Sequence, residues 1–357
     1  MTLKTTVKSN VKKVSCSVVG ARGYAGLELA KILLQHPHVD LKYCFATSAF
    51  EISDYLISEK SSKVECLLDS EIMTHLTDVV FLATPAEVSL KLAPQILANS
   101  KGQVKKVIDL SGAFRLKTHD YEKWYGFKHT ERTLLEKSQY GLLPWVGPAN
   151  SENLIANPGC YATAITMALI PLLKSSLIDI EHIVIDAKSG ATGGGRKASE
   201  NLLFTEVDGE CLPYKVGRHQ HEPEIIEAVR AATGKKIQPQ MTTSLIPVRR
   251  GIIAGIYATL VNGKTIVDVE AAFSKAYDGY SLVKHATVAK TPQLMSLKKV
   301  VGTPKVHISY EVVDRRLYVF SCIDNLLKGA ASQAVENLNR INDWSVETGL
   351  NGMEVLI

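Results

Sequence analysis

The sequence predicts an α/β protein built of two units, an N-terminal doubly wound parallel sheet and an α+β unit with a mainly antiparallel sheet. Three observations support this prediction. The chain has 357 residues, which exceeds the usual size of one domain. Its first part alternates short apolar strands with segments of helical periodicity. After about residue 156, several strands follow one another with few helices between them, which is typical of an antiparallel sheet.

The first unit opens with a strand, a turn and a helix. Residues 14–19 form a short apolar strand, and residues 20–26 form a glycine-rich turn. Apolar residues then recur at helical spacing over 27–35, and the helix ends before Pro37. Repetition of strand and helix predicts parallel pairing with right-handed crossovers. Later strands, each ending in small or polar residues, are expected at 41–46, 79–83 and 107–110.

The second unit starts with a helix at 160–174 and a strand at 183–188. A glycine-rich loop at 189–196 and a long polar passage to His221 follow. Helical spacing resumes at 223–232, and we expect the helices to lie on one side of the sheet. Further strands are expected at 242–247, 251–261, 305–312 and 317–323.

Composition excludes several classes of function. The net charge of +5 is mild, and basic and acidic residues are interspersed, so we expect no nucleic-acid partner. The acid-free basic segment from Lys4 to Lys13 is expected to be a solvated tail. No stretch resembles a signal peptide, and no run approaches the roughly 18 apolar residues of a membrane span. We therefore expect a cytoplasmic protein without a membrane partner.

The cysteines show no pattern of a metal site or a disulfide framework. They lack CxxC spacing, and a chain of this length needs no disulfide scaffold. We therefore expect no metal. Of the six, Cys160 is considered below, and the other five are expected to be small core residues: Cys16, Cys44, Cys66, Cys211 and Cys322.

The turn between the first strand and the first helix carries glycines at 20, 23 and 26. Such glycines permit a tight turn and close approach of the backbone to a pyrophosphate, and the following helix N-terminus supplies amide donors. The spacing is GxxGxxG rather than GxGxxG, so a purely structural turn is the alternative. Because the turn joins a strand to a helix at the start of the chain, it favours a Rossmann-type dinucleotide site.

The second strand ends in Thr47 and Ser48 and carries no acid there. An enzyme that uses NAD usually places Asp or Glu at this point to hold the ribose 2′-hydroxyl. Hydroxyl donors without negative charge suit a 2′-phosphate, so the sequence favours NADP(H) as the cofactor. The alternative is that both hydroxyls only cap the following turn.

Cys160 stands in 157-NPGCYATA-164, directly at the start of a predicted helix. A thiolate attacks acyl carbons readily, and a helix N-terminus lowers the pKa of a thiol while its amides can hold an oxyanion. On local sequence alone, a buried structural thiol is an equally good interpretation.

Two histidines, His219 and His221, lie in 217-GRHQHEPEI-225 just before a predicted helix. At least one suits general acid–base catalysis, with one ring facing a pocket and the other facing solvent. A metal site is disfavoured because no matching cluster of ligands accompanies them, and surface histidines without a role are the alternative. Candidate anion-binding groups are arginines, each of which could instead form an ordinary salt bridge: Arg115, Arg196, Arg249 and Arg250.

Several motifs in a fixed order give the chain a resemblance to a known family. They are 20-GARGYAGLELAKILLQHP-37, 80-VFLATPAEVS-89, 109-DLSGAFRL-116, 125-YGF-127, 157-NPGCYATA-164, 188-KSGATGGGRKA-198, 219-HQHEPEI-225, 250-RGI-252 and 324-DNLLKGAASQAVENLN-339. Together they resemble the N-acetyl-gamma-glutamyl-phosphate reductase family of the aspartate-semialdehyde dehydrogenase superfamily. The resemblance covers nearly the whole chain and implies a semialdehyde-dehydrogenase-like fold.

The resemblance also implies roles for particular residues. Cys160 matches the nucleophile, His221 the acid–base group and His219 its companion, while Lys328 matches a C-terminal motif that returns toward the cofactor. The resemblance places Gly20, Gly23, Gly26, Ser189, Gly190 and Asn325 at the cofactor. We expect further cofactor contacts from Arg22, Tyr24, Thr47, Ser48, Ala83, Thr84 and Pro85. Our candidates for binding the substrate are Arg115, Arg196, Arg249 and Tyr214. The chain departs from the family pattern at Thr192, at Gln220 and at 302-GTP-304, which leaves the fine substrate preference open.

The implied activity is NADPH-dependent reduction of N-acetyl-glutamyl 5-phosphate to the 5-semialdehyde and phosphate through a cysteine thioester, in arginine biosynthesis. Alternatives are reduction of aspartyl phosphate or of carrier-linked aminoadipyl phosphate, a non-catalytic NADP-binding sensor, and a zinc enzyme.

We expect an NADP-binding domain at 1–156 and a catalytic and oligomerisation domain at 157–324. The C-terminal segment 325–357 is expected to complete the NADP-binding domain. The final helix, at 325–340, fits either domain. The expected partners are the small acyl phosphate, inorganic phosphate and further copies of the chain in a dimer or tetramer.

Overall fold

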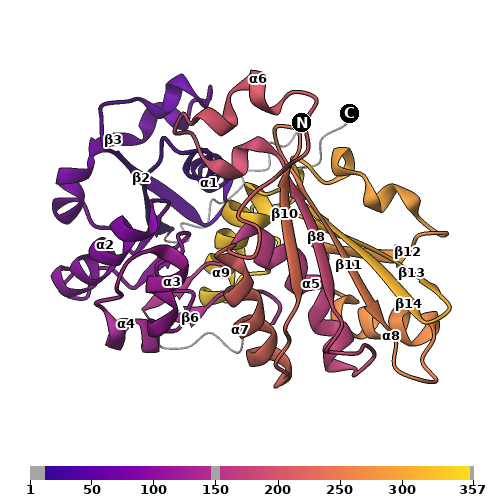
Figure 1. Ribbon diagram of the computed structural model, residues 1–357. Coiled ribbons are helices and arrows are strands. Elements are labelled where there is room, and N and C mark those ends of the chain that lie inside the picture. Colours follow the sequence, from indigo (N-terminus) through magenta and orange to yellow (C-terminus); the bar gives the residue numbers. More distant parts are fainter. Residues whose placement is uncertain (1–12, 146–152, 354–357) are drawn as a thin grey trace, which may run out of the picture.

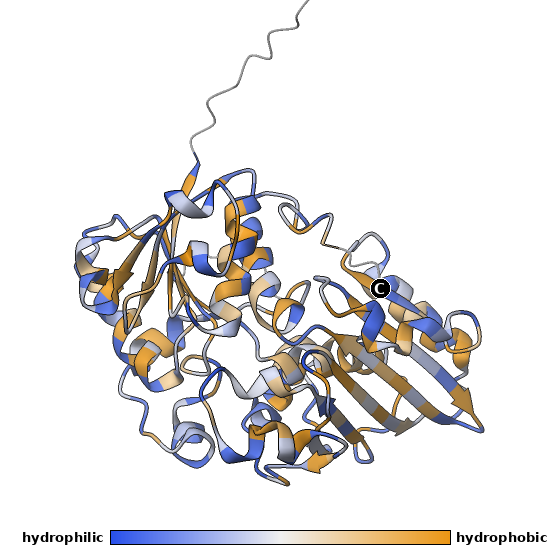
Figure 2. Ribbon diagram, turned by 90° about the horizontal axis from the view of Figure 1, so that it is seen from above, coloured by the Kyte–Doolittle hydropathy of each residue, from blue (hydrophilic) through white to orange (hydrophobic). Residues whose placement is uncertain are grey.

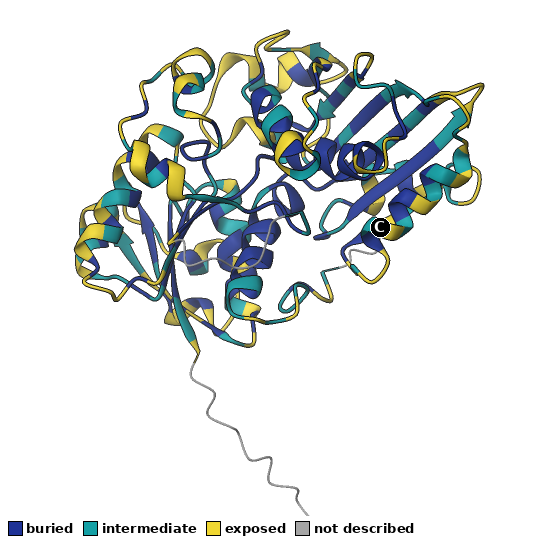
Figure 3. Ribbon diagram, turned by 90° about the horizontal axis from the view of Figure 1, so that it is seen from below, coloured by how far each residue is buried: buried dark blue, intermediate teal, exposed yellow. Residues whose placement is uncertain are grey.

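The computed structural model describes residues 13–145 and 153–353, which form two seven-stranded sheets with helices packed against them (Figure 1). In Figure 3 the buried residues run along the strands of both sheets, so each sheet is the centre of its own core. No helix in the described part of the chain is long and apolar enough to cross a membrane.

Every strand pair of the first sheet is parallel, as the sequence predicts. The strands are in the order β3-β2-β1-β4-β5-β7-β6, and the chain changes direction across the sheet between β1 and β4. In a doubly wound sheet, the crevice at this change of direction receives the ligand. The strands are β1 (Val14–Val19), β2 (Val39–Ala46), β3 (Glu65–Leu68), β4 (Val79–Leu82), β5 (Lys106–Asp109), β6 (Gln139–Tyr140) and β7 (Leu154–Ala156).

Helices cover both faces of the first sheet. On one face, α1 (Tyr24–Gln35) and α9 (Ser332–Ile341) share a core with β1. On the other face lie α2 (Ala86–Asn99), α3 (Tyr121–Tyr125) and α4 (Arg132–Lys137). The strands between them are largely hydrophobic (Figure 2), as expected for a parallel sheet that is buried on both faces. The last helix of the chain therefore packs on the first sheet.

The second sheet is mainly antiparallel, as predicted, and only its pairs β8–β10 and β12–β13 are parallel. Its order is β12-β13-β14-β11-β8-β10-β9. The strands are β8 (Val184–Ser189), β9 (Leu212–Pro213), β10 (Gln240–Leu245), β11 (Ile252–Thr259), β12 (Val283–Thr287), β13 (Val306–Val313) and β14 (Arg316–Ile323). One face packs against α5 (Cys160–Lys174), α7 (His221–Thr233) and α8 (Ile266–Tyr277), and the short α6 (Phe204–Val207) lies in a loop.

Some local expectations were wrong. The chain from 325 to 340 is not one helix, because a π-helical turn at Leu327–Ala331 precedes α9. Cys211 is exposed beside β9 rather than buried in a core, and Cys66 is only partly buried. The sequence patterns gave no expectation for α2 or α8. Short 3-10 turns occur at Ile52–Asp54, Ser61–Lys63, Asp69–Thr74, Thr118–Asp120, Ala191–Gly194, Glu200–Leu202, Pro292–Met295 and Leu297–Lys299.

A buried ion pair fixes the π-helical turn. Lys328 Nζ lies 2.6 and 2.8 Å from the two carboxylate oxygens of Glu336, and both side chains are fully buried. The hydroxyl of Tyr280, between α8 and β12, donates to the same carboxylate at 2.6 Å. Burial lowers the pKa of Lys328 and raises the pKa of Glu336, while their mutual attraction opposes both shifts. Lys328 is therefore held in the interior.

We expect Glu336→Gln to lower the free energy of unfolding by about 3–5 kcal/mol, because it leaves the Lys328 ammonium buried without a counter-charge. Urea unfolding would measure the loss. A matched control is Glu270→Gln, which breaks the exposed pair with Lys290 and should cost less than about 1 kcal/mol. Equal unfolding midpoints for the two variants would contradict the expectation.

Candidate active site

The glycine turn brings together the carboxyl ends of the central strands of the first sheet. The amides of Gly20 and Ala21 both donate to Phe45 O, at the end of β2, at 3.0 Å. Gly20 has a φ of 80°, and a Cβ there would lie 2.5 Å from Ala83 O. A Cβ on Gly26 would collide with Gly20 O. The turn thus needs glycine at both positions, which brings the N-terminus of α1 close to the crevice.

Cys160 is the first residue of α5, as predicted, and it lies where the two units of the protein meet. Gly159 is the N-cap and no side chain caps the helix, so no capping side chain competes with a ligand for its first amides. The π-helical turn packs directly behind the cysteine, since a Cβ on Gly329 would lie 2.6 Å from Cys160 Cβ. The α5 helix behind it is buried over nearly its whole length, which fixes the position of the thiol.

His219 and His221 line the same cavity as Cys160, which has a volume of about 670 Å³. Both rings are buried, with centroids 4.9 Å apart, so the expectation that one of them faces solvent was wrong. The His221 amide donates to His219 Nδ1 at 3.2 Å, which places any proton of a neutral His219 ring on Nε2. His221 Nε2 faces Gly159, where a Cβ would collide with it.

Glu224, which the sequence analysis did not single out, contacts the turn before Cys160 and lies close to Arg115 and His221. Its Oε1 accepts hydrogen bonds from the Gly159 amide and the Tyr140 hydroxyl, both at 2.7 Å. Its Oε2 lies 3.6 Å from Arg115 Nη1 and 3.9 Å from His221 Nε2. The sequence feature that could have indicated a role for Glu224 is its position three residues after His221, in the first turn of α7, where a carboxylate is favoured.

Comparison with known proteins identifies the family. Residues 15–153 match the model of the semialdehyde dehydrogenase NAD binding domain, and residues 160–325 match that of the semialdehyde dehydrogenase dimerisation domain. An N-acetyl-gamma-glutamyl-phosphate reductase of Streptococcus thermophilus is 38% identical over 342 residues, which are 94% of this chain and 97% of the relative. One of Geobacillus sp. is 40% identical over 350 residues, 94% of this chain and 98% of the relative. The chain belongs to the N-acetyl-gamma-glutamyl-phosphate reductase family.

Solved structures support the same fold. Aspartate semialdehyde dehydrogenase II from Vibrio cholerae superimposes with a TM-score of 0.67 at 17% identity, over 93% of this chain and 99% of that chain. The aspartate semialdehyde dehydrogenase of Francisella tularensis gives 0.68 at 17% identity, over 92% of this chain and all of that chain. Membership in the reductase family makes the protein an oxidoreductase of the semialdehyde dehydrogenase type.

The residues at the end of β2 fit the NADP(H) expected of a family member. Thr47 and Ser48 are exposed there, and Arg22 Nη1 donates to Ser48 Oγ. The Nε of Arg22 is buried without a partner among the described residues. Two hydroxyls and a guanidinium suit a phosphate group, whereas a free ribose hydroxyl would be matched by a carboxylate. Thr84, on the other side of the crevice, is hydrogen-bonded to Ser89 at 2.8 Å, and Pro85 occupies the N-cap position of α2 without a side-chain capping bond.

The second glycine loop, at 189–196, shares a cavity with the first residues of α1 and is fixed by Asn325. Asn325 accepts from the Gly251 amide at 2.7 Å and donates to Thr192 Oγ1 at 3.0 Å, so both ends of its amide are engaged inside the protein. Thr192 in turn donates to Arg249 O at 2.7 Å. The replacement of the usual serine by threonine therefore keeps the hydroxyl that this contact needs. Gly190 permits close approach, since a Cβ there would lie 2.7 Å from Val248 O.

The four substrate candidates do not come together. Tyr214 lines the Cys160 cavity, with its hydroxyl 3.0 Å from that of Tyr161. Arg115 is held by Glu224 and donates to the carbonyls of Leu110 and Asn157 at 2.6 and 2.8 Å. Arg196 and Arg249 lie apart from the cysteine, on a second cavity of about 690 Å³ beside α1.

Lys215 is the cation that the sequence analysis missed. It lies at the rim of the Cys160 cavity, and its Nζ donates to Gln220 Oε1 at 2.7 Å. The residue has a φ of 47°, which is uncommon for a residue with a Cβ. Its charge contributes to lowering the pKa of both histidines. No cluster of metal ligands occurs among residues 13–145 and 153–353.

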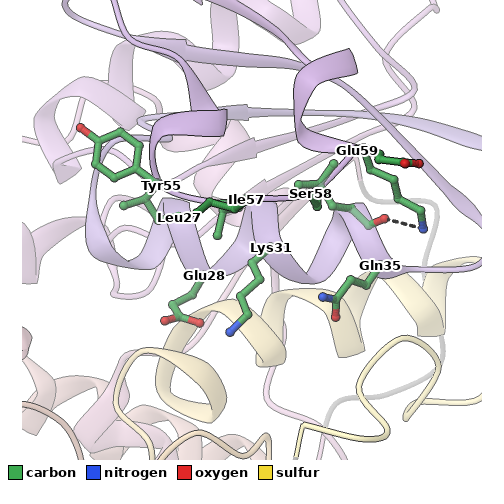
Figure 4. A pocket seen from close by; sticks show the side chains of 11 residues that line it. Leu27, Glu28, Lys31, Gln35, Tyr55, Ile57, Ser58 and Glu59 are labelled. Carbon is green, nitrogen blue, oxygen red and sulfur yellow. Dashed lines mark hydrogen bonds between the residues drawn. The ribbon is translucent and has the colours of Figure 1, made fainter.

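Another cavity, of about 820 Å³, lies between α1 and the segment 55–60 (Figure 4). Its lining contains Leu27, Glu28 and Lys31 of α1 but no cysteine or histidine. Lys60 Nζ closes one end by donating to Leu34 O at 3.0 Å, and Tyr55 stands at the other end. Neither Cys160 nor the two histidines, His219 and His221, line this cavity.

Burial dominates the electrostatics of the site. It raises the pKa of Cys160 to about 11, although nearby backbone amides and Arg115 act in the opposite direction. It also lowers the pKa of His219 to about 2 and that of His221 well below the ordinary value, and in both cases neighbouring positive charges add to the effect. The resting site thus pairs a neutral thiol with neutral imidazoles near neutral pH, contrary to the expectation that the helix N-terminus yields a lowered thiol pKa.

We expect the rate of Cys160 alkylation by iodoacetamide to rise about tenfold per pH unit from about pH 7 to about pH 10. The raised pKa means that the reactive thiolate keeps increasing with pH over this whole range. Mass spectrometry would resolve the peptide with Cys160 from that with the exposed Cys211. A plateau of the Cys160 rate near pH 8 would contradict the raised pKa.

Proposed function

We propose that the protein catalyses NADPH-dependent reduction of N-acetyl-glutamyl 5-phosphate to N-acetyl-glutamate 5-semialdehyde and phosphate, a step of arginine biosynthesis. The observation that carries this proposal is that partly buried Cys160, at the uncapped N-terminus of α5, and buried His221 line the same cavity. The named relatives, which match almost end to end, supply the substrate.

In the first half of the reaction, neutral His221 takes the proton of the Cys160 thiol as the sulfur attacks the acyl carbon. The first amides of α5 hold the oxyanion that forms, and the C–O bond to phosphate then breaks to leave a thioester on Cys160. A low imidazole pKa keeps His221 unprotonated and able to accept this proton. Burial of the site excludes water that would hydrolyse the thioester.

In the second half, NADPH supplies, when bound, the hydride that reduces the thioester carbonyl. The α5 amides again hold the developing oxygen charge, and collapse of the adduct releases the aldehyde and the Cys160 thiolate. His221 returns its proton to the sulfur, which restores the resting thiol. Glu224 keeps the His221 ring beside Gly159 during both halves, because it lies near Nε2 and binds the Gly159 amide.

The substrate carries two anionic groups, a carboxylate and a phosphate. For one of them we propose Lys215, which lies on the rim of the cavity and has a neutral partner, Gln220. Arg115 serves instead to hold Glu224, because its nitrogens are engaged by that carboxylate and by two carbonyls. We also propose a cytoplasmic location, since all six cysteines are free and the reaction needs a reduced Cys160.

The reverse reaction tests this proposal. We expect the protein to reduce NADP⁺ with N-acetyl-glutamate 5-semialdehyde only when phosphate is present, and to prefer this aldehyde to aspartate semialdehyde. Cys160→Ser should lower turnover by more than about 1,000-fold with an unchanged circular dichroism spectrum. Equal or better use of aspartate semialdehyde would contradict the substrate, and retained activity of the serine variant would contradict the nucleophile.

We further propose that the protein self-associates through the face of the second sheet that lies opposite α5 and α8. The sequence of this part matches a domain described as a dimerisation domain. An aromatic cluster lies on this face, where Tyr257 contacts Tyr318 and Phe320 with ring centroids 5.9 and 6.3 Å apart. Val184 of β8 is also exposed on this face. Such rings supply the apolar core that a stable interface between copies requires.

We expect the wild-type protein to be a dimer or tetramer and Tyr257→Asp to shift it to a smaller species, because a buried charge in the interface core is unfavourable. Size-exclusion chromatography with light scattering would measure the mass. Val267→Asp, on the exposed side of α8, is the matched control and should leave the mass unchanged. A monomeric wild-type protein would refute self-association.

A further inference from the structure

Arg196 reaches from the second unit of the protein to the glycine turn of the first. It belongs to the loop after β8, but its Nη1 donates to Arg22 O at 3.0 Å. Its guanidinium carbon lies 5.2 Å from the centroid of the Tyr55 ring, which follows β2. The contact therefore joins the loop of the second unit to the end of β2.

Two guanidinium groups meet at this point without a counter-ion. Arg22 donates to Ser48, while its buried Nε has no partner. Hydrogen bonds from Arg196 and Arg22 lower the pKa of the Tyr55 hydroxyl, so both cations lie beside it. No acidic side chain of the described residues pairs with either arginine. A cluster of two cations with hydroxyl donors is chemically complementary to a phosphate group.

The location of this cluster indicates which phosphate it would bind. In a doubly wound nucleotide site, the residues after the second strand face the 2′ position of the adenosine ribose. Ser48 is two residues beyond the end of β2, and Arg22 lies within the glycine turn. A dianionic 2′-phosphate would match the charge of the two guanidinium groups beside these residues, whereas a plain hydroxyl would leave both charges unmatched.

We propose that Arg196, together with Arg22, binds the 2′-phosphate of NADP(H) and so couples recognition of this cofactor to the position of the loop over the cysteine. The same loop forms a wall of the Cys160 cavity through Gly193, Gly194, Ser199, Asn201 and Leu202. The assignment rests on the proposed use of NADP(H), and it replaces the expectation that Arg196 binds the substrate.

The test uses two small nucleotides that differ only in the phosphate, adenosine 2′,5′-bisphosphate and adenosine 5′-monophosphate. We expect wild-type protein to bind the bisphosphate more tightly by calorimetry, and Arg196→Ala to weaken that binding by about 10-fold to 100-fold with no change for the monophosphate. In hydrogen-exchange mass spectrometry, the bisphosphate should protect residues 191–203 in the wild type and not in Arg196→Ala.

Lys197→Ala is the matched control. It removes a cation from the same loop for which the described residues provide no hydrogen bond or ion pair, so its binding and protection should equal those of wild type. Wild-type affinity or wild-type loop protection in Arg196→Ala would overturn the inference, as would equal binding of both nucleotides by the wild-type protein. A protein that lacks the proposed turnover but retains Arg196-dependent binding would reject the reaction and support the inference.

Discussion

The buried carboxylate of Glu224 is the contact on which the active site depends. It receives a hydroxyl from β6 of the first sheet and an amide from the turn before Cys160, and it faces Arg115 and His221. A buried charge is tolerated only when such partners compensate its lost hydration, and removing a partner from a buried ion pair costs about 3–5 kcal/mol. One side chain therefore fixes Cys160, His221 and the junction between the two units, that is, the proposed nucleophile and the proposed base.

This arrangement explains why the thiol is not activated at rest. A charge at a helix terminus gains about 0.3–1 kcal/mol from the helix dipole, whereas burial of a thiolate costs more. The result at Cys160 is a raised pKa. Burial also lowers the pKa of His221, and the positive charges of Arg115 and Lys215 lower it further, so the ring stays neutral. At rest the Cys160 thiol and the His221 imidazole are therefore both uncharged, and in the proposed reaction the thiolate forms only as its proton moves to His221.

The features predicted correctly are those determined by neighbours in the chain. The glycine turn and the start of α5 at Cys160 follow from turn chemistry and helical periodicity within a few residues. The contacts of Glu224 and Arg196 could not be predicted from the sequence, because their partners are distant in the chain. Glu224 contacts Gly159, 65 positions away, and Arg196 contacts Arg22, 174 positions away. The π-helical turn interrupts an apolar pattern that otherwise reads as one helix, because Gly329 must pack against Cys160.

The arginines that pair with buried carboxylates have a structural role, and those without an acidic partner are candidates for binding a ligand. Arg250 is neutralised on both sides, by Glu28 of α1 at 2.5 Å and by Asp324 at 2.9 Å, and so ties the two units together. Asp324 is itself saturated, since it also accepts amides of Gly302 and Leu326 at 2.8 Å. Arg115 is likewise opposed by Glu224. A cation whose charge is already matched gains little from an anionic ligand, whereas an unmatched one gains a charge-assisted hydrogen bond. By this criterion the cofactor-side pair Arg22 and Arg196, and Lys215 at the cysteine, are among the cations of the described residues that remain available for phosphate and carboxylate groups.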